Sequence, residues 1–335
     1  MKLLEVKNLR TTFQIDAGQV QAVRGISFHI DKGETIGIVG ESGSGKSVTM
    51  LSIMQLLPDN ARVEADRLAF DGVDLLKLDA KEMRRIQGNE IGMIFQDPMT
   101  SLNPLFTIGD QLMEPIRIHQ KVSKAEARKR AIEVLKLVEI PSPESRLNQY
   151  PHEFSGGMRQ RVMIAIAISC NPKLLIADEP TTALDVTIQA QILDLMRDLK
   201  KKFDTSIVLI THDLGVVASM CSRILVMYGG QIVEEGKTRE VFYNPKHPYT
   251  WGLIRSIPKA REGRKEKLIP IPGSPPDLLA PPKGCPFTAR CEHAMKVCAE
   301  LPPVSVPVSD THRAACWLMH PKAAKRRPEV TKHGI

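Results

Sequence analysis

Short apolar runs, each followed by a polar or glycine-rich turn, recur through the first 254 residues of the chain. Such uninterrupted runs are typical of strands buried on both faces, and the stretches between them have helical periodicity. This alternation predicts an α/β fold with a mainly parallel sheet. The predicted buried strands are 35–39, 173–178, 206–210 and 224–228; the predicted helices are 47–55, 124–138, 159–169 and 188–202; residues 4–13 and 22–30 are predicted antiparallel edge strands.

Residues 255–335 differ in composition from the rest of the chain. They carry 13 of the 24 prolines and four of the six cysteines. With 15 basic and 7 acidic residues, they also account for the whole net charge of +8. We expect a charged stretch at 260–267, an irregular Pro-rich segment after it, and a frayed basic end beyond Lys322. A basic surface of this kind suits an anionic partner or simple solvation.

The composition disfavours several classes of function. Aromatic residues make up only 4% of the chain, which argues against a stacking surface for single-stranded nucleic acid. No apolar run approaches the 18 residues that a membrane-spanning helix needs. The first ten residues lack the apolar core of a secretion signal, so we expect a cytosolic protein.

A glycine-rich segment follows the first predicted buried strand and opens the helix predicted at 47–55. Its pattern, G-x-x-x-x-G-K-S, lets backbone N–H groups turn inward around phosphates, and the helix N-terminus adds positive partial charge. Lys46 would reach the β- and γ-phosphates, and Ser47 would ligate Mg²⁺. A purely structural glycine turn is the alternative. The predicted phosphate loop consists of Gly40, Glu41, Ser42, Gly43, Ser44, Gly45, Lys46 and Ser47.

Two further segments carry candidate chemistry. Asp178 and Glu179 end a predicted strand, where Asp178 would hold Mg²⁺, directly or through water, and Glu179 would polarise an attacking water. A Ser-Gly-Gly turn at 155–157 precedes a predicted helix, and an exposed helix N-terminus binds anions. Because one nucleotide needs only one phosphate loop, this second turn suggests that two chains share nucleotides.

In their order along the chain, these segments resemble the motifs of the ATP-binding cassette (ABC) ATPases. The resemblance covers about residues 1–254. The resemblance implies ATP and Mg²⁺ as ligands, an antiparallel β edge subdomain, and a helical subdomain at about 97–170. It implies these roles: 40–47 as Walker A; Gln96 as a ligand of Mg²⁺ and water that links the site to a membrane partner; Ser155, Gly156 and Gly157 as the signature; Asp178 and Glu179 as Walker B with the catalytic glutamate; Asp185 in the D-loop; His212 as the γ-phosphate sensor; Phe13 as the adenine-stacking aromatic. Met158 replaces the usual signature glutamine, but the serine hydroxyl and glycine N–H groups remain, so nucleotide binding is expected to survive.

A narrower resemblance extends over nearly the whole chain. Residues 96–104 (QDPMTSLNP), residues 247–250 (HPYT) and the cysteine-bearing tail are similar to the dipeptide and oligopeptide importer ATPases of prokaryotes. The resemblance implies an ATP-hydrolysing subunit, peripheral on the cytoplasmic face of the cell membrane, that powers peptide uptake. The implied partners are a second ABC ATPase chain (a copy or a paralogue), two transmembrane permeases and an extracytoplasmic peptide-binding protein.

Two other functions compete with peptide import. An importer ATPase for nickel or another solute would share the nucleotide motifs, but such ATPases generally lack so long a cysteine-bearing tail. A nucleic-acid- or ribosome-associated ABC ATPase would suit the basic tail, but this chain has one cassette rather than two in tandem. We therefore expect no nucleic-acid partner.

Four cysteines are clustered in the tail, and they are spaced x5, x6 and x17. Cytosolic disulfides are rare, and a small Pro-rich unit buries too little apolar surface to be stable without a cross-link. These thiols therefore favour a metal site. The spacing lacks the paired C-x₂-C of zinc ribbons but leaves an iron–sulfur cluster, zinc and unliganded thiols open. The importer resemblance implies a [4Fe–4S] cluster on Cys285, Cys291, Cys298 and Cys316. We expect changes in this region, taken as 255–335, to leave nucleotide binding by 1–254 largely intact.

Overall fold

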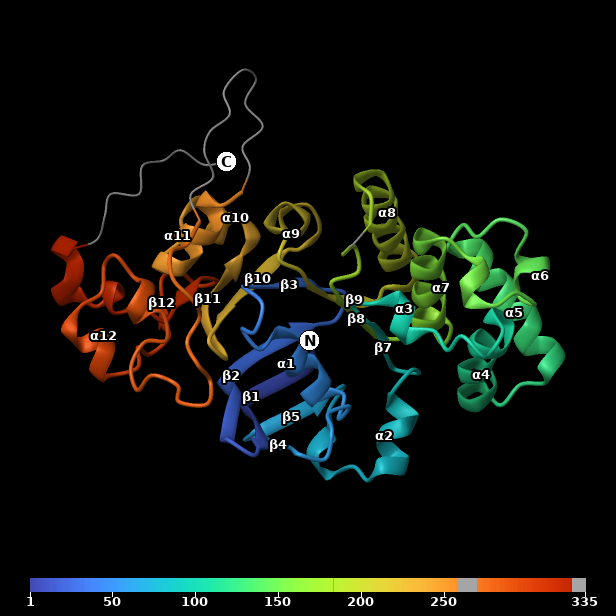
Figure 1. Ribbon diagram of the computed structural model, residues 1–335, viewed down its shortest axis with the longest axis horizontal. Helices are drawn as coiled ribbons and strands as arrows, with labels where there is room; N and C mark the ends of the chain where they lie inside the picture. Colours follow the sequence, from blue (N-terminus) through green and yellow to red (C-terminus); the bar gives the residue numbers. More distant parts are fainter. Residues whose placement is uncertain (183, 258–269, 327–335) are drawn as a thin grey trace, which may run out of the picture. The chain divides into compact units, whose positions relative to one another are not determined.

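The computed structural model describes residues 1–182, 184–257 and 270–326, and the chain divides into two compact units (Figure 1). The loop unit contains residues 4–29, 35–76 and the described part of 211–335. The helical unit contains residues 1–3, 30–34 and 77–210. The charged stretch at 260–267 and the chain end beyond residue 326 lie outside the described residues. Within the described ranges, no helix is both long and apolar enough to span a bilayer.

A parallel pair of strands forms the centre of the loop unit. The five residues of β3 (Thr35–Val39) are all buried, and β3 lies parallel to β10 (Arg223–Tyr228). On the other side of β10, β11 (Gln231–Lys237), β13 (Arg313–Ala314) and β12 (Val306–Pro307) follow in antiparallel order. The helices of this unit include α1 (Lys46–Ile53), α9 (Leu214–Met220), α10 (Thr238–Tyr243) and α11 (Pro248–Arg255).

The same unit contains an antiparallel sheet at the predicted edge. Its strands are ordered β2 (Gly18–Asp31), β1 (Lys2–Ile15), β5 (Arg67–Phe70) and β6 (Val73–Asp74), and β4 (Ala61–Glu64) pairs with the far end of β1. In β1 the buried positions shift from Leu4 and Val6 to Leu9 and Thr11. Asn8 lies at the shift with φ of 49°, a left-handed conformation that asparagine tolerates better than most residues. At this residue the buried face of the strand changes from the even-numbered to the odd-numbered side chains, so Leu9 is buried as well as Leu4 and Val6.

The helical unit is built on a second set of buried parallel strands. β7 (Ile91–Ile94), β8 (Leu174–Asp178) and β9 (Ser206–Ile210) lie side by side in that order. The helices α4, α5 and α7 pack against one another, and Figure 1 shows α3 to α7 gathered at one end of this unit. The helices are α2 (Ala80–Ile86), α3 (Pro98–Ser101), α4 (Ile108–Gln120), α5 (Lys124–Leu137), α6 (Pro143–Arg146), α7 (Gly156–Ile168) and α8 (Val186–Phe203). The α/β class and the mainly parallel core are thereby confirmed.

The described part of the C-terminal region consists of short elements joined by irregular stretches, and it packs within the loop unit. Its elements are the single turns η3 (Thr288–Arg290) and η4 (Trp317–Met319), the short helix α12 (Lys296–Glu300), η5 (Pro321–Arg326), and the strands β12 and β13. The Pro-rich segment runs along β2, where the Leu278 carbonyl accepts from the Gln21 N–H at 2.9 Å and the Pro282 carbonyl from Arg24 at 3.1 Å. The region therefore shares a compact unit with the predicted phosphate loop.

Candidate nucleotide site and cysteine cavity

The predicted phosphate loop leaves the buried strand β3 and ends where α1 begins. Gly40 and Gly45 have φ of 154° and 97°. A Cβ at Gly40 would lie 2.2 Å from the Met227 carbonyl oxygen, and one at Gly45 would lie 2.6 Å from the Ala22 carbonyl oxygen. Both positions therefore exclude every side chain on conformational and steric grounds. The close fit holds the loop backbone tightly against the strands beneath it.

Lys46 lies at the first position of α1 and is buried. Its Nζ donates to the carbonyl oxygens of Gly40 at 2.9 Å and of Glu41 at 3.0 Å, so the ammonium group bridges the start of the loop. Ser47 follows at the next helical position and is half-buried. A glycine N-cap provides no side-chain oxygen for the first N–H groups of α1. An anion is the ligand that such a backbone and ammonium group attract.

Gln96 and Glu179 meet in the helical unit because of the register of two strands. Ile94 of β7 lies opposite Ala177 of β8, so Gln96 and Glu179, each two positions further along the chain, are level. Gln96 Nε2 donates to Glu179 Oε2 at 3.4 Å, and the Thr182 hydroxyl donates to the same oxygen at 2.8 Å. Asp178, the last residue of β8, is buried. The structure therefore brings the carboxamide of Gln96 to the carboxylate of Glu179, the residue after Asp178. Oxygen ligands of these kinds are the ones that Mg²⁺ accepts.

The Ser-Gly-Gly turn caps α7 in the same unit. Ser155 Oγ accepts from the Met158 backbone N–H at 3.3 Å, so the cap does not depend on the Met158 side chain. Ser155 and Gly156 are exposed, and a Cβ at Gly156 would meet nothing within 4 Å. The substitution of Met158 for the usual glutamine thus leaves the capping hydroxyl in place, and the helix N-terminus is open to a ligand.

The remaining predicted residues lie at exposed or half-buried positions. His212 is exposed, directly before Asp213, whose carboxylate caps α9 through the N–H groups of Gly215 and Val216. Phe13 is half-buried in β1, opposite Ala61 of β4. Asp185 is the exposed N-cap of α8.

The four tail cysteines line one small cavity of the loop unit. None of them is in a disulfide, and Cys285 is further tied to Cys298 by an N–H···O=C bond of 2.7 Å. Burial raises the pKa of Cys285; burial also raises the pKa of Cys291 to about 11 and that of Cys316 to about 12. The neighbouring thiols add to all three shifts. Burial therefore favours the protonated form of Cys285, Cys291 and Cys316, whereas a bound metal would deprotonate its thiol ligands.

His247, the first residue of the HPYT segment, lines the same cavity. Its side chain is buried, which lowers its pKa to about 3 and keeps the imidazole neutral. Nδ1 accepts from the Tyr249 N–H at 3.1 Å, so the proton lies on Nε2, which has no hydrogen-bond partner among the described residues. A buried donor without a partner is costly, and a sulfur-rich anionic group would satisfy it.

Binding of a single metal ion requires more than thiols that line the same cavity, because the ligand atoms must converge on one point. Within the described residues, no three His, Cys, Asp or Glu side chains are grouped so that they could hold one ion. Neither the zinc alternative nor the iron–sulfur cluster gains support from this arrangement. Four thiols are a donor set that both iron–sulfur clusters and structural zinc sites use.

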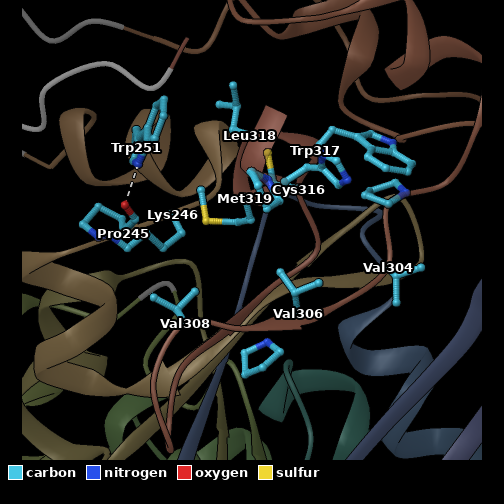
Figure 2. Close-up of a pocket in the computed structure, with 14 residues that line it drawn as sticks. Pro245, Lys246, Trp251, Val304, Val306, Val308, Cys316, Trp317, Leu318 and Met319 are labelled. Carbon is cyan, nitrogen blue, oxygen red and sulfur yellow. Dashed lines mark hydrogen bonds between the residues drawn. The ribbon is translucent and has the colours of Figure 1, made fainter. Parts of the chain in front are cut away.

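A second, apolar cavity of about 680 Å³ lies beside Cys316 (Figure 2). Valines, prolines and both tryptophans of the chain line it, and each indole N–H is already bonded: Trp251 to the Pro245 carbonyl at 2.9 Å and Trp317 to the Leu301 carbonyl at 2.9 Å. Lys246 and His320 are the basic residues among its lining residues. Neither the phosphate loop nor the residues around Glu179 contribute to it, so it is not the nucleotide site.

The class of protein follows from the fold and these motifs, and comparison with known proteins agrees. Residues 23–182 match the family model "ABC transporter", and residues 233–298 match "Oligopeptide/dipeptide transporter, C-terminal region". Among solved structures, the ATP-binding cassette MJ0796, described as dimeric in a post-hydrolysis state bound to ADP and Pi, is 32% identical with a TM-score of 0.64; the match covers 70% of this chain and 99% of that one. The protein belongs to the ABC transporter family and is a transport ATPase.

Curated relatives narrow the comparison. The oligopeptide transport ATP-binding protein OppD of Bacillus subtilis is 59% identical, over 98% of this chain and 92% of its own length. The dipeptide transport ATP-binding protein DppD of the same organism is 55% identical, over 96% of both chains. The OppD protein of Escherichia coli is 53% identical, over 90% of this chain and 89% of its own length. The chain is thus similar to these peptide-transport subunits through both the cassette and the tail.

Proposed function

We propose that this protein is the ATP-hydrolysing subunit of an importer of oligopeptides or dipeptides, bound peripherally at the cytoplasmic face of the cell membrane. The observation that carries the proposal is the match of residues 233–298 to the oligopeptide/dipeptide transporter C-terminal region, because the cassette by itself is shared by transporters of many solutes. The relatives reported above are named for peptide transport, and no observation favours nickel or nucleic acid instead.

The proposal assigns residues 1–254 to ATP binding and residues 255–335 to a C-terminal metal-cluster region. Phosphoryl transfer requires positioning and charge neutralisation, which the two groups of residues supply. The proposed roles are: Gly40 to Ser47 hold phosphates, with Lys46 on the β- and γ-phosphates; Ser47, Gln96 and Asp178 surround Mg²⁺; Glu179 activates water; His212 senses the γ-phosphate; Phe13 stacks on adenine; Ser155, Gly156, Gly157 and Asp185 face the nucleotide bound by a second ATPase chain.

We place the contact with a permease on the segment that follows Gln96. Met99, Leu105 and Phe106 are 62%, 81% and 53% exposed, an unusual density of apolar side chains in solvent. A membrane partner that covers them would bury apolar surface and press on Gln96, which contacts Glu179. An extracytoplasmic peptide-binding protein would complete the importer.

A pair of ATPase chains leads to a kinetic prediction. The exposed Ser-Gly-Gly turn serves the partner's nucleotide, so hydrolysis requires association of two chains. We expect the specific ATPase activity of the isolated protein to rise with protein concentration until the ATP-bound dimer saturates. Activity that is constant per chain, in a species that light scattering shows to be monomeric with MgATP, would contradict this prediction.

For the tail we propose a [4Fe–4S] cluster on Cys285, Cys291, Cys298 and Cys316. Two observations support it: the four thiols line one cavity, and the buried His247 Nε2 in the lining has no hydrogen-bond partner among the described residues. When bound, the cluster supplies ligand bonds that replace missing apolar burial; ATP hydrolysis needs no electron from it. The chain's own residues orient it and exclude water from it.

Uptake in cells tests the proposed function. In a strain that lacks the gene, the wild-type chain should restore uptake of a labelled tripeptide or dipeptide, and Glu179→Gln should not. Glu90→Gln is the matched control, because Glu90 stands at the other end of the same strands, paired with Lys173 at 2.9 Å. Loss of nickel uptake with unaffected peptide uptake in the deletion strain would overturn the proposal.

A further inference from the structure

Glu41, the second residue of the phosphate loop, is held by a residue of the C-terminal region. Arg290 Nη1 lies 2.6 Å from Glu41 Oε2, and Arg290 Nη2 lies 3.0 Å from Glu41 Oε1. The pair is bidentate, the strongest geometry between these groups, and only 5% of the Arg290 side chain is exposed. The two residues are 249 positions apart in the chain.

The guanidinium group cannot turn away from Glu41 without losing other bonds. Besides the two bonds to Glu41, Arg290 donates to the carbonyls of Pro272 and Ile271 at 2.8 Å and 3.1 Å, and to the Tyr228 hydroxyl at 3.1 Å. These five bonds match the five N–H donors of an arginine. The group also lies over the rings of Tyr228 and Phe287. Lysine could not reproduce this arrangement.

The backbone of Glu41 is held as well. Its N–H donates to the Tyr249 hydroxyl at 2.7 Å. Tyr249 is fully buried and packs against the rings of Tyr228 and Phe287, with centroids 4.5 Å and 5.4 Å away. Tyr249 and Arg290 both belong to the region that matches the oligopeptide/dipeptide transporter family. Two parts of that region thus hold the same loop residue.

Glu41 in turn contacts Lys46, the residue that we assign to the β- and γ-phosphates. Its carbonyl oxygen accepts from Lys46 Nζ at 3.0 Å, so movement of Glu41 displaces an acceptor of the ammonium group. A carboxylate in a loop that binds a polyanion also repels it, and Arg290 neutralises that charge. Both effects act on nucleotide affinity rather than on the water activated at Glu179.

We propose that Arg290 is a positioning residue of the nucleotide site, which acts through Glu41 and allows the C-terminal region to set the affinity of the phosphate loop for MgATP. The inference rests on the proposed role of residues 40–47 in ATP binding. Arg290 directly precedes Cys291, which lines the cysteine cavity, at the end of η3. A displacement of Cys291 would therefore move Arg290 and, with it, Glu41 of the phosphate loop. The C-terminal region is then a working part of the ATP site rather than an appendage.

Steady-state kinetics of the full chain test the proposal. Arg290→Gln should raise KM for MgATP about tenfold, within the 5- to 150-fold range of typical coupling between sites, with kcat nearly unchanged. Arg290→Lys, which keeps the charge but not the fork, should recover part of that loss. Tyr249→Phe keeps the buried ring and removes only the hydroxyl that accepts from the Glu41 N–H, so it should also raise KM. This second variant tests the proposal even if Arg290→Gln fails to fold.

A double-mutant cycle shows whether Arg290 acts through Glu41. In Glu41→Gln, the further change Arg290→Gln should have little added effect on KM. The matched control is Arg313→Gln, since Arg313 lies in the C-terminal region and pairs with Glu235 of β11 at 3.8 Å. An unchanged KM in folded Arg290→Gln and Tyr249→Phe, or an equal rise in Arg313→Gln, would overturn the inference. A parent chain that binds no MgATP would instead refute the proposed function.

Discussion

Glu179→Gln should bind MgATP as tightly as the parent chain and lose turnover by about 10²- to 10⁴-fold, the usual contribution of a general base. Glutamine keeps the shape of the side chain and an oxygen that can accept from Thr182 and Gln96, the partners of Glu179 in the structure. It cannot accept a proton from water at neutral pH. Binding and chemistry should therefore separate in this one variant.

The measurements are ATP affinity by equilibrium dialysis, phosphate release, and oligomeric state by light scattering with MgATP. Since the nucleotide is bound but not consumed, the variant should accumulate as a dimer. Glu90→Gln, at the opposite end of β7 and β8, should hydrolyse ATP at close to the parent rate. Parent-like hydrolysis by Glu179→Gln would remove Glu179 from the role of base.

Anaerobically purified protein should be brown and contain about four irons per chain, as a [4Fe–4S] cluster requires. Cys291→Ser should lose the colour and most of the iron, because one of four ligands is gone. It should also loosen the tail, since the small region has little apolar burial to hold it together. Through Arg290, the neighbour of Cys291, we further expect a weaker affinity for MgATP, contrary to the sequence-based expectation of independence.

Iron and zinc analysis, together with electron paramagnetic resonance of the reduced protein, distinguishes an iron–sulfur cluster from zinc and from unliganded thiols. Cys170→Ser is the matched control, because Cys170 is a buried thiol of the helical unit, outside the cysteine cavity. It should keep the full iron content. Stoichiometric zinc without iron would replace the cluster with the zinc alternative, and a metal-free protein that folds normally would leave the thiols unliganded.

Elements with a strong local signal were predictable from the sequence. The strands β3, β8, β9 and β10 lie within one residue of their predicted bounds, because an uninterrupted apolar run flanked by turn residues has few other ways to be buried. Other elements were not predicted, among them β7 and α4. β7 has only four residues and includes Gly92, and α4 contains Pro115, which ordinarily interrupts a helix. Their stability comes from the neighbours they pack against rather than from their own residues.

The nucleotide motifs were also readable, since the spacing of glycine, lysine and serine in the phosphate loop is set by local backbone geometry. What only the tertiary structure decided is which distant side chains meet. The parallel register of β7 and β8 brings Gln96 to Glu179, and packing of the C-terminal region brings Arg290 to Glu41. No periodicity along the chain encodes such pairs, because strand order and packing choose them after each element has formed.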